Sequence, residues 1–161
     1  MSAVVHTRNR LESWVSFLRA HAAITRQLNA DLLNEHGLTL SDYEVLLRLS
    51  SADGGMMRRV DLAESVLLTA SGITRLLDGL ERAGFVEKAA CASDARVSYA
   101  KITDAGMQKL AEAGRTHLAG VDEVFVGRFS DEELEQLAAL LSRLPQTPHD
   151  GHDRCTVAAE G

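Results

Sequence analysis

The side chains best suited to chemistry in this chain lie on one face of a predicted helix that begins after Thr69. Hydroxyl and guanidinium groups recur there at helical spacing and concentrate toward the N-terminal half. Such groups can form hydrogen bonds with base edges in a DNA major groove. The outward stripe comprises Ser71, Thr74, Arg75, Asp78 and Arg82, and the opposite, apolar stripe comprises Ile73, Leu76, Leu77, Leu80 and Gly84.

A two-stranded pattern follows this helix after a turn at Gly84. Residues 85–90 and 97–102 read as strands, and a tip of small and polar residues, 91–96, joins them. A helix followed by a hairpin is the order found in a winged helix-turn-helix. Arg96 is the candidate for a minor groove, because a narrow groove has a negative potential that attracts a guanidinium. Asp94 would hold Arg96 or cap the turn, although the two could also form a plain surface ion pair.

We predict DNA contact for residues of both the helix and the hairpin. Two alternatives stay open. The helix face could simply be solvated, and Arg75 could pair with Asp78 at i+3 instead of binding a guanine. The predicted contact residues are Thr69, Ser71, Gly72, Thr74, Arg75, Arg82, Lys88, Asp94 and Arg96.

The net charge of −6 opposes binding to a polyanion, so its distribution matters. Residues 104–161 carry 11 acidic and 5 basic side chains, whereas residues 41–103 carry 9 and 8. A modest basic face can therefore form on the middle segment. The chain of 161 residues suits one domain with its own core. It has neither a membrane-length apolar run nor a signal-like start, so we expect a cytoplasmic protein with no membrane contact.

The other elements are predicted from periodicity and caps. We expect helices over residues 7–35, from a capping box at Ser41 and Glu44, over 61–66, from Thr103 to about residue 127, and from a capping box at Ser130 to residue 144. Residues 56–58 would form a small edge strand. The core face of the second helix is predicted to be Tyr43, Leu46, Leu47 and Ser50.

The predicted fold is mainly α with a small β-hairpin wing: a winged helix-turn-helix with six helices in an intertwined homodimer. The three longer helices carry more apolar surface than the compact middle segment can cover, and two-fold symmetry lets one patch cover its own copy. We assign 1–40 to an N-terminal dimerisation helix, 41–103 to the winged helix-turn-helix, 104–144 to C-terminal dimerisation helices and 145–161 to a disordered tail.

Other reactive side chains fit inert roles better. Cys91 lies at the hairpin tip with only Lys88 nearby to lower its pKa, so we expect an inert thiol rather than a redox sensor. His149, His152 and Cys155 have the spacing of metal ligands but fall in the predicted tail, so we predict no metal site and no cofactor. No nucleophile–base constellation is present, and we predict no enzyme.

The chain resembles the MarR family of winged-helix transcription regulators from about Leu11 to Arg143. The resemblance rests on three motifs in order: Ser71-x-x-Thr74-Arg75-Leu76-Leu77-Asp78-x-Leu80-Glu81-x-x-Gly84-Phe85-Val86, then Asp94-x-Arg96, then Ile102-Thr103-x-x-Gly106. It implies a homodimer on a pseudo-palindromic duplex operator, with each recognition helix in a major groove and each wing arginine in a flanking minor groove. It also implies a small-molecule effector that releases DNA.

The resemblance places Trp14, Phe17 and His21 near the family's ligand pocket, although a core or dimer-interface role suits them better. The chain departs from the family pattern at Gly79, where a basic residue is common, in a wing poor in basic residues, and at Arg58-Arg59-Val60, which lacks a hydroxyl cap. The expected function is a sequence-specific DNA-binding repressor relieved by a ligand. A winged-helix dimer scaffold, or a redox- or metal-sensing regulator, is the alternative.

Overall fold

The computed structural model describes residues 2–66, 69–90 and 97–145, with the side chains of 2–10, 70 and 90 left aside. Its described part contains six α-helices and a small sheet, as the sequence predicts. In chain order the elements are α1 (Ser2–His36), α2 (Leu40–Ser51), η1 (Asp53–Gly55), β1 (Met56–Arg58), α3 (Arg59–Ser65), α4 (Ala70–Arg82), β2 (Val86–Ala90), β3 (Ser98–Ile102), α5 (Asp104–Val124), η2 (Val126–Arg128) and α6 (Asp131–Leu141).

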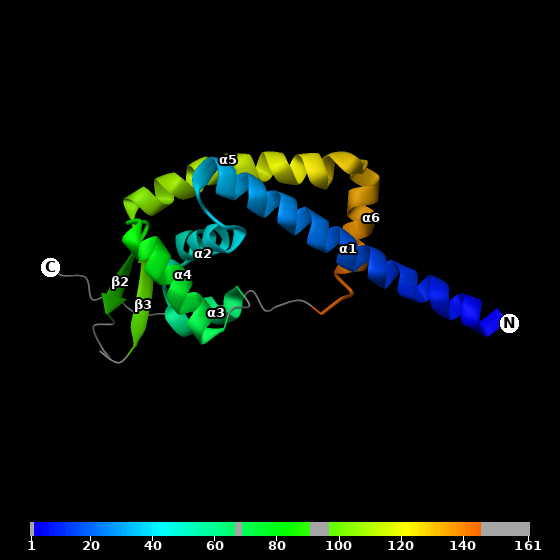
Figure 1. Cartoon of the computed structure of the whole chain (residues 1–161), viewed down its shortest axis with the longest axis horizontal. Coiled ribbons are helices and arrows are strands. Elements are labelled where there is room, and N and C mark those ends of the chain that lie inside the picture. Colours follow the sequence, from blue (N-terminus) through cyan, green and yellow to red (C-terminus); the bar gives the residue numbers. More distant parts are fainter. Residues whose placement is uncertain (1, 67–68, 91–96, 146–161) are drawn as a thin grey trace.

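Two long helices lie above a smaller cluster of helices and strands (Figure 1). The C-terminal half of α1 packs against α5, and α2 packs beneath both helices. The N-terminal part of α1 extends beyond its neighbours, and residues 11–23 are exposed throughout. At 1.5 Å per residue, the 35 residues of α1 make it about 50 Å long, against about 30 Å for the 21 residues of α5.

The sheet has three antiparallel strands in the order β1-β3-β2. In β3, Ala100 lies opposite Met57 of β1 and Lys88 of β2. The two hairpin strands begin one residue later than the sequence pattern suggests, at Val86 and Ser98. The predicted edge strand at 56–58 is confirmed. It joins the sheet beside β3, so the hairpin is attached to the body along one edge.

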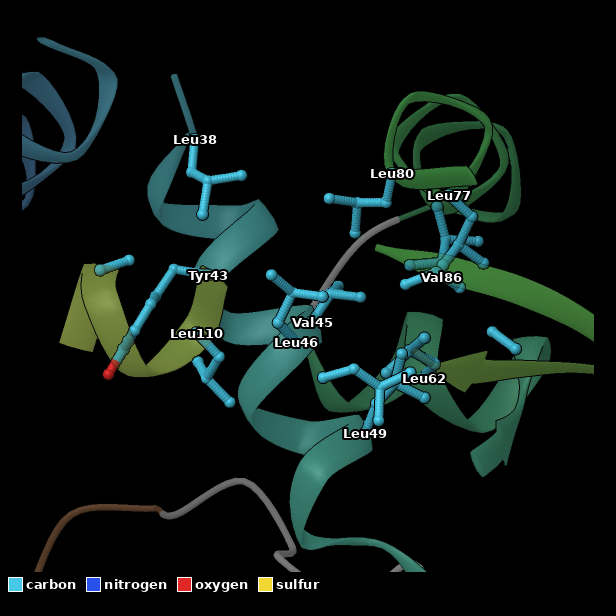
Figure 2. Close-up of a cluster of buried hydrophobic side chains, with 14 of the residues drawn as sticks. Leu38, Tyr43, Val45, Leu46, Leu49, Leu62, Leu77, Leu80, Val86 and Leu110 are labelled. Atoms are coloured by element: carbon cyan, nitrogen blue, oxygen red, sulfur yellow. The ribbon is translucent and has the colours of Figure 1, made fainter. Parts of the chain in front are cut away.

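Side chains from α2, α3, α4 and the sheet converge on one core (Figure 2). Leu46 and Leu49 of α2 are fully buried at its centre. Each buried leucine stabilises the fold by roughly 1.5–3 kcal/mol. The other core residues shown by the contacts are Leu32, Leu38, Tyr43, Val45, Leu62, Ala63, Ile73, Leu77, Leu80, Val86, Ala100, Ile102, Leu110 and Ala113.

Three of the predicted helix caps are confirmed, at Thr69, Thr103 and Ser130. Gly84 does not belong to the buried stripe of α4, because it is exposed and ends the helix with a φ of 78°. The amide of Phe85 donates to the carbonyl of Leu80 at 2.9 Å, which is the closing bond of a Schellman motif. The turn thus directs the chain from α4 into β2.

The predicted cap at Ser41 is wrong. Thr39 caps α2, since its hydroxyl accepts from the amide of Asp42 at 3.1 Å and the Asp42 carboxylate accepts from the Thr39 amide at 2.8 Å. Asn29 of α1 accepts a hydrogen bond from the amide of Leu40 at 2.9 Å. This contact between helices satisfies one more free amide at the helix start and favours the earlier cap.

The predicted faces and ends of several helices also need correction. Leu47 is 43% exposed and Ser50 is half-buried, whereas Val45 and Leu49 are buried, because α2 contacts α5 on one side and the sheet on the other. The remaining corrections concern bounds: α1 begins at Ser2 and ends at His36, α3 spans Arg59–Ser65, α5 ends at Val124, and α6 ends at Leu141.

Candidate nucleic-acid interface

The candidate interface is centred on α4, whose start is fixed by Thr69. The Thr69 hydroxyl accepts a hydrogen bond from the Gly72 amide at 3.1 Å and lies 3.2 Å from the Ser71 hydroxyl. Helix N-termini carry free amides and a partial positive charge, which suit an anion such as a phosphate. The end of α4 that presents Thr69, Ser71 and Gly72 therefore combines hydroxyls with a favourable field.

The two faces of α4 separate as predicted. Ile73, Leu77 and Leu80 are buried against the core, and Leu76 is half-buried. The outward stripe is exposed at every position: Ser71, Thr74, Arg75, Asp78 and Arg82. The helix thus offers solvent a polar surface about three turns long, on a rigid element.

Arg75 and Asp78 do not form the i+3 pair that the sequence allowed. Among the described residues Arg75 has no ion-pair partner, while Asp78 lies 3.9 Å from Nη2 of Arg59. Arg82 donates from Nε to the carbonyl of Asp78 at 3.1 Å, which holds it along the helix. Arg75 is therefore the guanidinium of this stripe that is available for a bidentate contact.

The wing is described only along its two strands. Lys88 is 64% exposed on β2, and its Nζ lies 3.4 Å from the Glu81 carboxylate of α4. Its charge is thus partly compensated within the protein. Asp94, Arg96 and Cys91 lie outside the described residues, as do His149, His152 and Cys155.

Sequence reasoning missed the role of Arg59. The sequence showed only that Arg58 and Arg59 lie where a hydroxyl cap is usual. The structure confirms that no side chain caps the start of α3. Arg58 instead binds the Asp61 carboxylate through two hydrogen bonds of 2.6 and 2.9 Å. Arg59 turns toward α4 and lies 3.9 Å from both Asp78 and Glu81. No local signal could reveal this, because the partners are about 20 positions away.

Trp14, Phe17 and His21 form a short aromatic row on successive turns of α1. Their ring centroids are 6.2 and 6.4 Å apart. Trp14 is 55% exposed and Phe17 is 41% exposed. The single chain therefore brings the three residues together on an open helix face rather than in an enclosed site.

A second polar cluster, not predicted, lies where α1 and α2 meet α5. Thr116 donates its hydroxyl proton to Glu35 at 2.9 Å, so His36 must donate through Nε2 to the Thr116 oxygen at 2.8 Å. The His117 ring lies 4.6 Å from the Tyr43 ring. Burial lowers the pKa of His117, and the Glu44 carboxylate opposes that shift in part. Burial also raises the pKa of Tyr43.

The described residues provide neither a metal site nor a membrane-spanning helix. Residues 2–66, 69–90 and 97–145 contain no group of three or more histidine, cysteine or acidic side chains placed to hold a metal ion. In the same part of the chain, no helix combines the length and apolar character needed to cross a membrane.

A helix with an exposed polar stripe, backed by a core and followed by an antiparallel hairpin, defines a winged helix-turn-helix protein. The MarR family model matches residues 36–97, which span α2 to the wing. The crystal structure of AbsC, a MarR family transcriptional regulator from Streptomyces coelicolor, is 31% identical, superposes with a TM-score of 0.75, and covers 81% of this chain and 88% of its own. The chain belongs to the MarR family of transcriptional regulators.

Two further relatives extend the comparison. The HTH-type transcriptional regulator MhqR of Bacillus subtilis is 26% identical over 148 residues, which is 92% of this chain and 99% of that protein. Sco3205, a MarR family regulator of Streptomyces coelicolor whose structure was solved in complex with DNA, is 24% identical, with a TM-score of 0.79 and coverage of 84% and 85%. The similarity thus extends beyond the winged helix-turn-helix (residues 41–103), which we call the reader, to the helices on either side of it in the sequence.

Proposed function

We propose that this protein is a sequence-specific, duplex-DNA-binding repressor that acts as a homodimer in the cytoplasm and is released by a small-molecule effector. The observation that carries the proposal is the exposed stripe of α4. Hydroxyls and an uncommitted guanidinium gather there at the N-terminal half of a helix that the core holds rigidly. Sco3205, a protein of the same fold, was solved in complex with DNA, which supports DNA as the binding partner.

The proposed contacts divide by position on the reader. Ser71, Thr74 and Arg75 would face base edges, with Arg75 bidentate to a guanine. Thr69, Gly72, Arg82 and Lys88 would contact phosphates and set the register without reading sequence. From the family resemblance, Arg96 would enter the flanking minor groove, with Asp94 orienting it.

The test begins with a binding site, which is selected from random duplexes with the wild-type protein. On that duplex at fixed salt, Arg75→Ala should lower the preference for the selected base by about 1–3 kcal/mol. Arg96→Ala should weaken binding mainly through the flanking base pairs. Arg128→Ala is the control, because its Nε binds a carbonyl of α5 at the opposite end of that helix from the wing. Wild-type affinity in both test variants would refute the assigned contacts.

The salt dependence gives an independent measure. Few cations on the reader are uncommitted, since Lys88 is paired with Glu81 and Arg59 faces two carboxylates. Each phosphate contact adds about 0.9 to the slope of log affinity against log salt. We expect a shallow slope, and a steep one would show that a basic surface has been overlooked.

The effector part of the proposal rests on the family resemblance and on the open aromatic row of α1. In a dimer this row would be enclosed, and Trp14 is the only tryptophan of the chain. Its fluorescence should therefore report both dimer formation and a ligand, such as a phenol, that binds near Phe17 and His21. A promoter-reporter strain then distinguishes repression from activation.

A second candidate function is a dimer scaffold that does not bind DNA. The net charge of −6 and the absence of a basic residue at Gly79 favour it. A gel shift against the region upstream of the protein's own gene separates the two functions, since a scaffold would fail to bind even at low salt.

A further inference from the structure

Four charged side chains connect the start of α3, the recognition helix α4 and the wing. Arg59 of α3 lies 3.9 Å from Asp78 and 3.9 Å from Glu81, both on α4. Lys88 of β2 lies 3.4 Å from Glu81 on its other side. We call these residues the α3–α4 charge cluster. It joins three elements that are separate in sequence and places two cations beside two carboxylates.

Arg59 and Glu81 form the sheltered part of this cluster. Their side chains are only 18% and 17% exposed. Nη2 of Arg59 and Oε1 of Glu81 are buried without a hydrogen-bond partner among the described residues. A separation of 3.9 Å exceeds hydrogen-bonding distance, so the attraction between them is Coulombic or passes through a water. Removing one charge from such a pair leaves the other uncompensated in a poorly solvated place.

The charge of Asp78 is a problem for a DNA reader. Asp78 lies on the outward stripe, one turn after Arg75, and is 51% exposed. A free carboxylate there would repel the phosphates that a recognition helix must approach. Arg75 does not compensate it, because Asp78 faces Arg59 instead. The compensating charge therefore comes from behind the helix, where it leaves the exposed face clear.

We propose that Arg59 is a positioning residue for DNA recognition. Its guanidinium neutralises Asp78 and Glu81, holds α4 at a fixed angle to α3, and leaves Arg75 available for the duplex. Arg59 itself would not contact DNA, since its side chain is only 18% exposed and its Nη2 is buried. This inference rests on the proposed DNA-binding function, and it assigns to the chain a determinant of affinity that lies outside the predicted contact set.

The test compares a variant that lacks only the Arg59 cation with a variant that also lacks the two carboxylates that Arg59 faces. Arg59→Met keeps the length of the side chain and leaves both carboxylates uncompensated, and we expect DNA affinity to fall about 10-fold with the salt slope unchanged. Adding Asp78→Asn and Glu81→Gln should restore affinity to within about 3-fold, because Lys88 is then the one charge of the cluster that remains, and its side chain is 64% exposed to solvent. Arg58→Met is the matched control, since Arg58, the last residue of β1, pairs with Asp61 of α3.

Two results of the binding measurements would overturn the proposal. Undiminished affinity in Arg59→Met is one. The other is a triple variant that stays weak while the slope falls by about 0.9, which would show that Arg59 binds a phosphate itself. Arg59→Lys is the control for a folding defect. It keeps the positive charge and should retain affinity to within about 3-fold. A loss of folding in both variants, with no recovery in the triple, would assign Arg59 a purely structural role.

A thermal-unfolding cycle without DNA separates this inference from the proposed function. The effects of Arg59→Met and Glu81→Gln on the melting temperature should be non-additive, with the second change recovering part of the loss caused by the first. If the wild-type protein binds no duplex at low salt, both the proposed function and the positioning role fail. Non-additive melting would then show that the cluster exists for stability alone.

Discussion

Arg75, Asp78 and Arg59 show how the use of one side chain depends on the partners of another. Asp78 is within reach of either arginine, and it faces the one on α3. A guanidinium that is not already bound to a carboxylate can pair with a guanine without first giving up a partner. At the scale of single residues, the ability of Arg75 to bind a base therefore depends on Asp78 being paired with another arginine.

His117 offers a residue-scale prediction about pH. Because burial lowers its pKa in the folded state, the unfolded chain binds the proton more readily. The contribution of neutral His117 to stability is thus complete above its ordinary pKa of about 6.5 and declines as the pH falls below that value. The melting temperature should drop by a few degrees between pH 7.5 and 5.5, and His117→Phe should reduce that drop. Identical pH profiles would refute this explanation.

Gly79 gives a second residue-scale prediction. A methyl group at Gly79 would meet no atom within 4 Å, and glycine inside a helix costs about 0.5–1 kcal/mol relative to alanine. Gly79→Ala should raise the free energy of unfolding by about that amount, as measured by denaturant titration. Gly84→Ala is the contrasting control, because a φ of 78° strains any side chain there. A destabilised Gly79→Ala would mean that the position has a partner this structure does not show.

At the scale of elements, the junction of α4, β2 and α5 holds the reader to the long helices. Thr103 donates its hydroxyl to the Gly84 carbonyl at 2.6 Å and its amide to the Phe85 carbonyl at 3.1 Å. The Gly106 amide then donates to the Thr103 hydroxyl at 3.1 Å. One threonine thus caps α5 and fixes the turn after the recognition helix, so a shift of α5 would be transmitted directly to α4.

The close packing at this junction predicts the effect of a single methyl group. A Cβ added to Gly106 would lie 2.1 Å from the Phe85 carbonyl oxygen, which the backbone cannot easily relieve. Gly106→Ala should destabilise the protein by roughly 2–3 kcal/mol in thermal or denaturant unfolding. On the same helix, Gly114→Ala meets only Tyr43 Oη at 3.7 Å and should be neutral or stabilising. Equal effects from both substitutions would contradict the packing described.

At the scale of the whole molecule, the most prominent feature is apolar surface that one chain does not cover. It lies mainly on α1, and the rest is distributed over α5, η2 and α6. The exposed large apolar side chains on the long helices and their ends are Leu11, Trp14, Val15, Phe17, Leu18, Leu33, Met107, Leu118, Val126, Phe129, Leu140 and Leu144. Contiguous exposed apolar surface on a soluble protein marks an interaction site. In the proposed homodimer a second copy of the chain would cover this surface, as two-fold symmetry allows.

The uncovered apolar surface predicts a dimer and a substitution that should dissociate it. The wild-type protein should sediment at twice the 17.4 kDa mass of one chain. Leu18→Glu places a charge on the uncovered face and should shift the protein toward monomer and weaken DNA binding. Leu47→Glu is a matched control, because Leu47 is 43% exposed on α2 where Leu18 is 45% exposed on α1. A dimer that tolerates Leu18→Glu would place the interface elsewhere.

The sequence by itself determined what depends on near neighbours. Element order, the caps at Thr69, Thr103 and Ser130, and the two faces of α4 follow from periodicity and from hydrogen bonds that span three or four positions. The family also followed from motifs, because their order and spacing are local properties of the chain.

Only the tertiary structure decided the features whose partners are distant in sequence. Asn29 favours the cap at Thr39 over the one at Ser41, and packing on both sides of α2 buries Val45 while leaving Leu47 exposed. Arg59 meets Asp78 and Glu81 only after α3 folds against α4. Folding therefore decides which charges on the recognition helix are compensated. The periodicity of the sequence does not encode the distance between Arg59 and its two carboxylate partners.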